Sequence, residues 1–271
     1  MPTTTTDEPT TRESGRAGPV PAIDGSPRFL APFSRPGFAV AMIALTAAAL
    51  LFFNRFSGID IYVAQLFFTE APCPEGSPKA VCGAFPASEN LVLDILRDVM
   101  HVMPPAIAVL LMVFAVSVAL NRSPGAGRVR LARGAVTAIA SLLICSLGLV
   151  NLVLKAESGR PRPYQTDMFG GKLPFVEAGR FTDYCDTNCS FVSGESSAAF
   201  WLLCLVPLVP SRWRPAALAA ALVVAFSAAG LRVAFGAHYL SDVTIAALLS
   251  LAVFSLLAML GTRLGWYRTE R

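Results

Sequence analysis

Six long stretches of this 271-residue sequence lack Asp, Glu, Lys and Arg and consist mainly of apolar residues. They cover residues 36–53, 101–120, 134–154, 196–211, 215–231 and 243–262. A helix needs about 20 such residues to cross the hydrocarbon core of a membrane, with a lower limit of about 17. The fourth and fifth stretches are short, but they become long enough if residues 193–195 and Arg232 lie at helix ends in a polar cavity. The sequence therefore predicts an all-α protein, an integral membrane bundle of six transmembrane helices.

The amino-acid composition agrees with a membrane protein and argues against two other classes. Hydrophobic residues make up 54% of the chain and charged residues 15%, which is too little polar surface for a soluble globule of this size. The net charge is +4, but the basic residues are scattered between apolar stretches rather than gathered in a stripe. Membrane lipids are therefore the expected partners, and neither nucleic acid nor an obligatory protein partner is expected.

The chain divides into a tail, a membrane domain and a second short tail. Residues 1–35 are rich in Thr, Pro, Gly and Arg and lack an apolar stretch, which predicts a disordered tail without a cleavable signal peptide. Residues 36–262 form the membrane domain, and residues 263–271 form the C-terminal tail. Within the domain, 59–68 and 90–100 are apolar stretches interrupted by polar residues, which predicts short interfacial helices in the outer loops. They either wall a lipid entrance or simply pack on the bundle.

Lys and Arg in short loops predict the orientation, because such residues tend to stay on the cytoplasmic side of a membrane. They gather in the first tail, after the second stretch, after the fourth stretch and after the sixth. Both termini are therefore expected to be cytoplasmic, and the loops 54–100, 155–195 and 232–242 are expected to face outward.

Four of the six cysteines lie in the predicted outer loops. Cys73 and Cys82 fall in the first loop, and Cys185 and Cys189 fall in the second. An oxidising exterior allows each pair to form a disulfide, although spacing alone does not show that the side chains meet. The other two cysteines fall inside predicted spans, where a small buried apolar role is typical. With no C-x-x-C pair and two histidines, the chain is not expected to bind a metal.

Two groups of polar residues lie at outer ends of predicted spans and could bind an anion. Lys155 ends the third span and Arg162 follows, and fixed cations of this kind hold a phosphate, although anchoring to lipid headgroups would explain them equally well. Ser193, Gly194 and Glu195 precede the fourth span. Free backbone amides at a helix start attract an anion, but Ser193 could also be a plain helix cap.

A third group contains the strongest candidate for a catalytic residue. His238 and Asp242 are four residues apart, so on a helix they would share a face, and the carboxylate could fix the imidazole in one tautomer. Arg232 stands six residues before His238. A lone histidine at a helix end is usually structural, but this combination at the same membrane face as two other candidate anion sites favours a catalytic role.

Together the three groups resemble the type 2 phosphatidic acid phosphatases, whose signature reads K-x6-R-P, P-S-G-H and S-R-x5-H-x3-D. The matching residues are Lys155, Arg162 and Pro163 for the first part and Arg232, His238 and Asp242 for the third, with Leu231 in place of the Ser. The resemblance covers about residues 95 to 260. Some lipid A phosphatases are similar in the arrangement of these motifs.

The resemblance implies a membrane lipid phosphatase whose site faces the periplasm from a bacterial inner membrane. It implies that His238 attacks phosphorus to form a phosphohistidine and that Asp242 activates it. The residues implied to bind the phosphoryl group are Lys155, Arg162, Ser193, Gly194 and Arg232. Phosphohistidine chemistry needs no metal, so no cofactor is expected.

The second motif departs from the family pattern, because Glu195 stands where the family has a histidine that acts as the general acid. A carboxylic acid can donate this proton only if its pKa is raised. Partial burial would raise the pKa of Glu195, and nearby cations would lower it. Glu195 is therefore a hypothesis for the general acid, beside another acid, a leaving group that needs none, or loss of activity.

The expected substrate is a phosphomonoester or diphosphate of a lipid, with lipid A as the single preferred compound. Undecaprenyl diphosphate and phosphatidylglycerophosphate are close alternatives, and a lipid phosphotransferase would use the same intermediate. A non-catalytic protein that binds phosphorylated lipid would not need an oriented nucleophile. A transporter is disfavoured because no internal repeat is visible. Vanadium haloperoxidases share the motifs but not the six spans.

Overall fold

The computed structural model describes residues 29–269 of the chain, and this part is almost entirely helical. The all-α class is confirmed. One antiparallel hairpin pairs two very short strands, β1 (Thr69–Glu70) with β2 (Gly83–Ala84). The predicted disordered tail lies outside the described residues up to residue 28, and so do residues 270–271 of the second tail.

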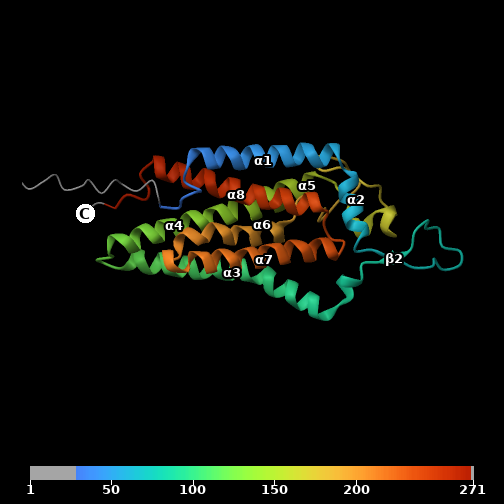
Figure 1. Cartoon of the computed structure of the whole chain (residues 1–271), viewed down its shortest axis with the longest axis horizontal. Coiled ribbons are helices and arrows are strands. Elements are labelled where there is room, and N and C mark those ends of the chain that lie inside the picture. Colours follow the sequence, from blue (N-terminus) through green and yellow to red (C-terminus); the bar gives the residue numbers. More distant parts are fainter. Residues whose placement is uncertain (1–28, 270–271) are drawn as a thin grey trace, which may run out of the picture.

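Long helices lie side by side along the length of the molecule (Figure 1). They are α1 (Pro36–Arg55), α3 (Leu91–Leu120), α4 (Ala126–Leu142), α7 (Arg214–Ala234) and α8 (Leu240–Arg263). Helix α4 continues as a π-helix, η2 (Leu143–Leu154), into α5 (Lys155–Glu157), and α6 (Gly194–Trp201) continues as a 3-10 helix, η5 (Leu202–Leu208). The remaining short helices are α2 (Gly58–Gln65), η1 (Pro86–Glu89), η3 (Pro163–Gln165), η4 (Asp167–Phe169) and η6 (Ser211–Trp213).

Within residues 29–269, five helices are long and apolar enough to cross a membrane. They are Pro36–Arg55, Leu91–Leu120, Ala126–Glu157, Ser211–Ala234 and Leu240–Arg263. Each contains one of the six predicted apolar stretches. The stretch 196–211 instead belongs to a shorter apolar helix, Gly194–Leu208, which Pro207 and a change to 3-10 geometry bring to an end.

One of the two predicted interfacial helices is not a separate element. Residues 91–100 form the first turns of α3 rather than a helix of their own, whereas 59–68 does contain the separate helix α2. The side chain of Asn90 caps α3 by accepting bonds from the amides of Val92 and Leu93. Pro104 and Pro105 lie inside the helix without ending it. The sequence was misleading here because the charged residues near 94–98 mark a helix that extends beyond its apolar stretch.

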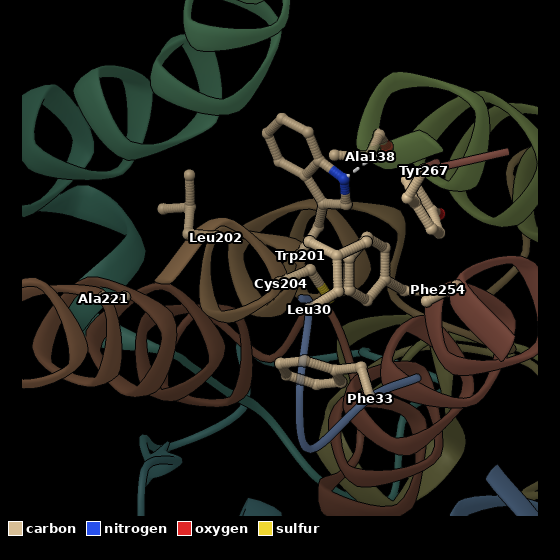
Figure 2. Close-up of a cluster of buried hydrophobic side chains, with 10 residues drawn as sticks. Leu30, Phe33, Ala138, Trp201, Leu202, Cys204, Ala221, Phe254 and Tyr267 are labelled. Atoms are coloured by element: carbon tan, nitrogen blue, oxygen red, sulfur yellow. Dashed lines mark hydrogen bonds between the residues drawn. The ribbon is translucent and has the colours of Figure 1, made fainter. Parts of the chain in front are cut away.

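A cluster around Trp201, which we call the Trp201 cluster, forms one part of the core (Figure 2). Its buried members are Leu30, Phe33, Ala138, Trp201, Leu202, Cys204, Ala221, Phe254, Ala258 and Tyr267. The indole Nε1 of Trp201 donates a hydrogen bond of 2.7 Å to the carbonyl oxygen of Ala138, which joins α6 to α4. The indole therefore contributes both buried apolar area and a satisfied polar group.

The predicted tail boundary at residue 35 differs from the structure. Residues 29–35 form turns, and Leu30 and Phe33 are buried in the Trp201 cluster. The ring of Phe33 packs edge-on against Phe254, with the centroids 5.1 Å apart. The apolar run at residues 29–33 is too short for a periodic pattern, so the sequence did not indicate the burial of Leu30 and Phe33.

The predicted disulfide pairs meet in space. Cys73 and Cys82 form a disulfide that closes the loop between β1 and β2, and Cys185 and Cys189 form another in the loop before α6. Cys145 and Cys204 are free and buried.

We expect Trp201→Ala to lower the free energy of unfolding by about 3–5 kcal/mol, because it leaves a cavity and removes a buried hydrogen bond. Thermal unfolding in detergent micelles measures this effect. Trp213→Ala is the matched control, because the Trp213 side chain is exposed, and it should change the midpoint little. Equal midpoints for the two variants would contradict the assignment of Trp201 to the core.

Candidate active site

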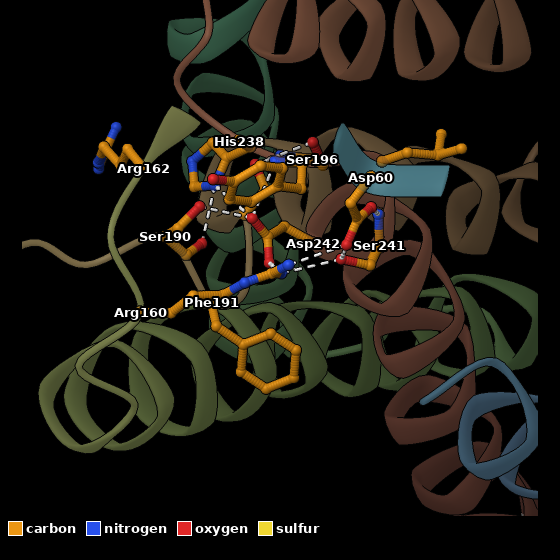
Figure 3. A network of polar contacts seen from close by, with 12 residues as sticks. Asp60, Arg160, Arg162, Ser190, Phe191, Ser196, His238, Ser241 and Asp242 are labelled. Atoms are coloured by element: carbon orange, nitrogen blue, oxygen red, sulfur yellow. Dashed lines mark hydrogen bonds and ion pairs between the residues drawn. The ribbon is translucent and has the colours of Figure 1, made fainter. Parts of the chain in front are cut away.

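The candidate site lies at the end of the bundle that carries α2 and the β1–β2 hairpin (Figures 1 and 3). Three segments meet there: the chain after α5, the start of α6, and the turn between α7 and α8. The three groups of candidate residues from the sequence are on these segments, so the fold brings them to one place.

His238 lies in the turn between α7 and α8, not on a helix. Helix α8 begins two residues later, at Leu240. The amide of His238 donates to the carbonyl oxygen of Arg232 at 3.1 Å. Gly236 makes the turn possible, because its φ is +63° and a Cβ there would lie 2.4 Å from the ring of Phe85. The expectation that His238 and Asp242 share a helix face is therefore wrong, although they do lie near each other.

The main chain of Ser190 fixes the tautomer of His238. Nδ1 of the ring lies 2.8 Å from the Ser190 carbonyl oxygen, which can only accept a hydrogen bond. The side chain is 1% exposed, and burial lowers the pKa of His238 to about 4, with Arg232 and Arg162 adding to the shift and Asp242 opposing it. The ring is therefore neutral at pH 7 with its proton on Nδ1, and Nε2 keeps its lone pair.

Asp242 acts on His238 by charge rather than by a direct hydrogen bond. Its Oδ2 is 3.7 Å from Nδ1 of His238, which is too long for a hydrogen bond. The same oxygen accepts a hydrogen bond from the amide of Tyr239 at 2.9 Å and from the hydroxyl of Ser190 at 2.5 Å. Asp242 is thus the capping residue in the first turn of α8, and this explains why a residue four positions away approaches a histidine outside the helix.

Arg160 joins Asp242 to helix α2 in a buried ionic network (Figure 3). Its guanidinium donates to Oδ1 of Asp242 at 2.5 Å and to Oδ2 of Asp60 at 2.8 Å, and all three side chains are fully buried. Asp60 also accepts hydrogen bonds from the amide and the hydroxyl of Ser241. The Tyr239 ring lies below the guanidinium, 4.4 Å from its carbon. Burial raises the pKa of Asp60, while Arg160 opposes the rise.

Sequence reasoning missed Arg160 and Asp60 as parts of the site. Arg160 belongs to the first Arg-Pro pair, and Arg162 to the second. Only the distance from Lys155 singled out Arg162. Asp60 was visible only as a charge in an apolar stretch about 180 positions before Ser241. A charge in such a stretch needs a partner, but the sequence cannot name that partner.

Arg162 and Arg232 line a cavity of about 590 Å³, together with Lys79, Arg97 and Tyr164. Arg162 is held by Asn188, because its Nε donates to the Asn188 carbonyl at 2.9 Å and its Nη2 donates to the side-chain oxygen at 2.7 Å. Asn188 has a positive φ of 51°, which Asn tolerates better than most residues. No motif or spacing singled out Asn188.

Ser193 caps the start of α6. It is fully buried, and its hydroxyl accepts hydrogen bonds from the amide of Ser196 at 3.3 Å and from the hydroxyl of Ser196 at 2.9 Å. Its contact with phosphate stays a prediction. The amides of Gly194 and Glu195 lie in the first turn, where no helical carbonyl is available to them. Lys155 is half-buried and close enough to Arg162 and Arg232 to interact with their charges.

Glu195 is paired with two arginines. Arg97 donates from Nε to Oε2 at 3.2 Å and from Nη2 to Oε1 at 2.9 Å, and Arg232 Nη1 lies 3.4 Å from Oε1. These partners stabilise the ionised carboxylate. Paired with these arginines, Glu195 is a carboxylate, and it must gain a proton before it can act as an acid. No group of three His, Cys, Asp or Glu side chains within residues 29–269 could hold a metal ion.

The chain is similar to one protein family and to several enzymes of the same name. The PAP2 superfamily matches residues 135–266. A lipid A 4'-phosphatase of Rhizobium leguminosarum is 42% identical over 214 residues, which is 79% of this chain and 91% of the relative. The enzyme of the same name from Rhizobium etli is 41% identical over 79% of this chain and 83% of the relative. A third, from Francisella tularensis subsp. novicida, is 41% identical over 41% of this chain and 51% of the relative. No solved structure matches this chain.

The match to the PAP2 superfamily and two relatives of 41–42% identity identify the chain as a phosphatase, that is, a phosphoric monoester hydrolase. The chain belongs to the PAP2 superfamily. With bacterial relatives and five helices long enough to cross a membrane, it is a bacterial membrane protein.

We expect Arg160→Ala to lower the free energy of unfolding by about 3–5 kcal/mol, because it leaves two buried carboxylates without their cation. Thermal unfolding in detergent measures the loss. Arg180→Ala is the matched control, since Arg180 forms an exposed ion pair with Glu177 and its removal should change the midpoint little. A midpoint for Arg160→Ala within error of the control would refute the role given to this network.

Proposed function

We propose that this enzyme hydrolyses a phosphomonoester of a lipid, with lipid A as the substrate, through a phosphohistidine formed on His238. The state of His238 carries the proposal, because the ring is neutral and Nδ1 faces the Ser190 carbonyl while Nε2 keeps a lone pair. A neutral imidazole with a free nitrogen is a nucleophile, and nearby arginines stabilise the charge on a phosphoryl group. The positive charges of Arg162 and Arg232 both interact with the His238 ring.

In the first step, Nε2 of His238 attacks phosphorus opposite the bond to the lipid oxygen. The N–P bond forms as the P–O bond breaks, and Glu195 donates its proton to the departing oxygen. In the second step, water attacks the phosphohistidine, Glu195 takes a proton from that water, and the N–P bond breaks to release phosphate. The charge of Asp242, 3.7 Å from Nδ1, stabilises the positive charge that the ring develops.

Cations and amides around the cavity are assigned to the phosphoryl oxygens. Arg162 and Arg232 line the cavity, and Lys155 lies close to both. The amides of Gly194 and Glu195 at the start of α6 add hydrogen-bond donors. The Nε of Arg232 is buried and has no hydrogen-bond partner among the residues that the structure describes, which supports an anion as its ligand. Ser193 caps α6 and so fixes the amides of Gly194 and Glu195, and its hydroxyl is assigned to the same phosphate-binding group.

An apolar cavity of about 440 Å³ next to the site suits a hydrocarbon chain of the substrate. It is lined by residues of α2, α6, α7 and α8, including Val233 and Leu240. Val233 follows Arg232 and Leu240 is two residues after His238, so the apolar cavity begins beside the phosphate-binding residues. A lipid phosphate places a charged group and an apolar chain next to each other in the same way.

Six membrane crossings are proposed. The shorter helix Gly194–Leu208 is counted as a crossing in addition to the five long helices, and it is the fourth in chain order. The start of α1 and the end of α8 lie at the same end of the bundle (Figure 1), which requires an even number of crossings. That end carries the Arg-rich connection between α3 and α4, so it is assigned to the cytoplasm. The site and both disulfides then face the periplasm of a bacterial inner membrane, where disulfides are stable. Residues 36–262 are the membrane phosphatase domain in this arrangement.

Lipid A is preferred as substrate because of the relatives. Two of them named lipid A 4'-phosphatase align with 79% of this chain, at 41–42% identity. The PAP2 superfamily and the three relatives together support a lipid phosphatase.

The pKa of His238 is directly measurable, because the chain has one other histidine. In His101→Gln with 15N-labelled histidine, we expect the His238 ring to titrate at about pH 4 by NMR and to carry its proton on Nδ1 at pH 7. Burial disfavours the charged ring, so the neutral form persists from neutral pH down to about pH 4. A midpoint near the ordinary value of 6.5 would show that the ring is not desolvated.

The proposed function is tested by phosphate release in detergent with a chelator present. The substrates are lipid A, undecaprenyl diphosphate and phosphatidylglycerophosphate. We expect the wild type to release phosphate from lipid A, His238→Ala to release none, and Glu195→Gln to be slower by about 10² or more. Arg180→Ala, which removes an exposed side chain paired with Glu177, is the control for handling and should match the wild type.

Each outcome of this assay has a definite meaning. Release from another lipid phosphate but not from lipid A would replace the substrate and keep the mechanism. Activity in His238→Ala would refute the phosphohistidine. Loss of lipid phosphate without release of inorganic phosphate would show transfer to an acceptor other than water.

A further inference from the structure

Arg97 is the closest partner of Glu195, although the two are 98 positions apart in the sequence. Two parallel hydrogen bonds of 2.9 and 3.2 Å join the guanidinium on α3 to the carboxylate on α6. Both side chains are largely buried, with 26% of Arg97 and 17% of Glu195 exposed. A two-bond pair of this kind fixes orientation as well as charge. Arg97 lies outside the region that the PAP2 superfamily matches and outside the three motifs.

Arg97 competes with Arg232 for the same carboxylate. Oε1 of Glu195 lies 2.9 Å from Nη2 of Arg97 and 3.4 Å from Nη1 of Arg232. Arg232 lines the cavity, and its Nε is buried without a hydrogen-bond partner among the described residues. A carboxylate that settled fully on Arg232 would occupy a cation that the phosphoryl group needs. The closer pair with Arg97 draws Glu195 away from that position.

The other groups around this pair suit Arg97 for holding Glu195 rather than for binding substrate. Asp98 and Asp94, on the same helix, lie 2.9 and 3.7 Å from Nη1 of Arg97. These two carboxylates approach Nη1, the guanidinium nitrogen that Glu195 does not contact, and they offset the positive charge of Arg97. His101 on α3 and Lys155 after η2 are also close enough to interact with the charge of Glu195.

We propose that Arg97 is a positioning residue for the general acid, which keeps Glu195 off Arg232 so that the phosphoryl group can bind there. The inference rests on the proposed function, because it assigns a partner to the acid of that reaction. When the phosphoryl group binds Arg232, Glu195 is left between one cation and a new anion. It then takes up one proton from a hydronium ion of the bulk solvent and, still held by Arg97, donates that proton to the lipid oxygen as the P–O bond breaks; the water that attacks in the second step returns a proton to it.

The role of Arg97 is tested by the binding of inorganic phosphate, measured by isothermal titration on the purified full chain in detergent. We expect Glu195→Gln to bind phosphate about tenfold or more tightly than the wild type, because a competing negative charge is removed. Arg97→Gln should bind it about tenfold more weakly, because Glu195 moves onto Arg232. The double variant should bind as Glu195→Gln does, since Arg97 acts only through Glu195.

A direct phosphate contact by Arg97 gives a different pattern. In that case the double variant would bind phosphate more weakly than Glu195→Gln, by the same factor that separates Arg97→Gln from the wild type. This result would overturn the inference, and so would Arg97→Gln with unchanged affinity or a wild type that binds no phosphate. Arg97→Lys keeps the charge without the fork, so it should restore part of the affinity. Arg180→Gln is the matched control and should bind as the wild type.

Kinetics separate this inference from the proposed function. With lipid substrate, Arg97→Gln should raise KM and lower kcat, whereas Glu195→Gln should lower kcat without raising KM. Unfolding midpoints of all variants identify any loss of fold, and Arg97→Lys provides the test if Arg97→Gln is unstable. A wild type that binds phosphate with the predicted variant pattern but hydrolyses no lipid phosphate refutes the proposed function and leaves the positioning role of Arg97 standing.

Discussion

The site depends on one buried cation. Arg160 contacts Asp242 from the start of α8 and Asp60 from α2, and each partner is completely enclosed. A buried guanidinium without both carboxylates, or either carboxylate without the guanidinium, would be strongly unfavourable. The three segments must therefore dock together or not at all. Asp242 in turn accepts from Ser190 and Tyr239, so the position of the His238 turn follows from the position of Arg160.

The class of fold was predictable from the sequence because a membrane imposes a simple rule on it. Apolar stretches of spanning length have almost no other use, and five of them became long apolar helices. The exact ends were less predictable, because α3 extends past its apolar stretch and Leu30 is buried by contacts that no local pattern records. For the shorter helix Gly194–Leu208, apolar length alone does not decide whether the helix crosses the membrane.

The chemistry of the site was only partly predictable. Spacing singled out His238, Asp242 and Arg232, and the fold brings them together. Spacing could not show that the Ser190 carbonyl orients the imidazole, because a backbone atom has no sequence signature. It also could not link Glu195 to Arg97, which lies on a different helix. Whether Glu195 is ionised depends on such partners, so only the three-dimensional structure identifies it as a carboxylate paired with arginines.

The bond from His238 to the Ser190 carbonyl has a consequence for how such a site evolves. The group that sets the tautomer belongs to the main chain, so no single substitution removes it. A change of Ser190 to another residue deletes only the hydroxyl that contacts Asp242. The orientation of the proposed nucleophile is thus insensitive to substitutions of neighbouring side chains, while the proposed proton donor, Glu195, acts through its side chain alone and is easily exchanged. A site built on this turn can keep its histidine while the residue proposed as its acid changes.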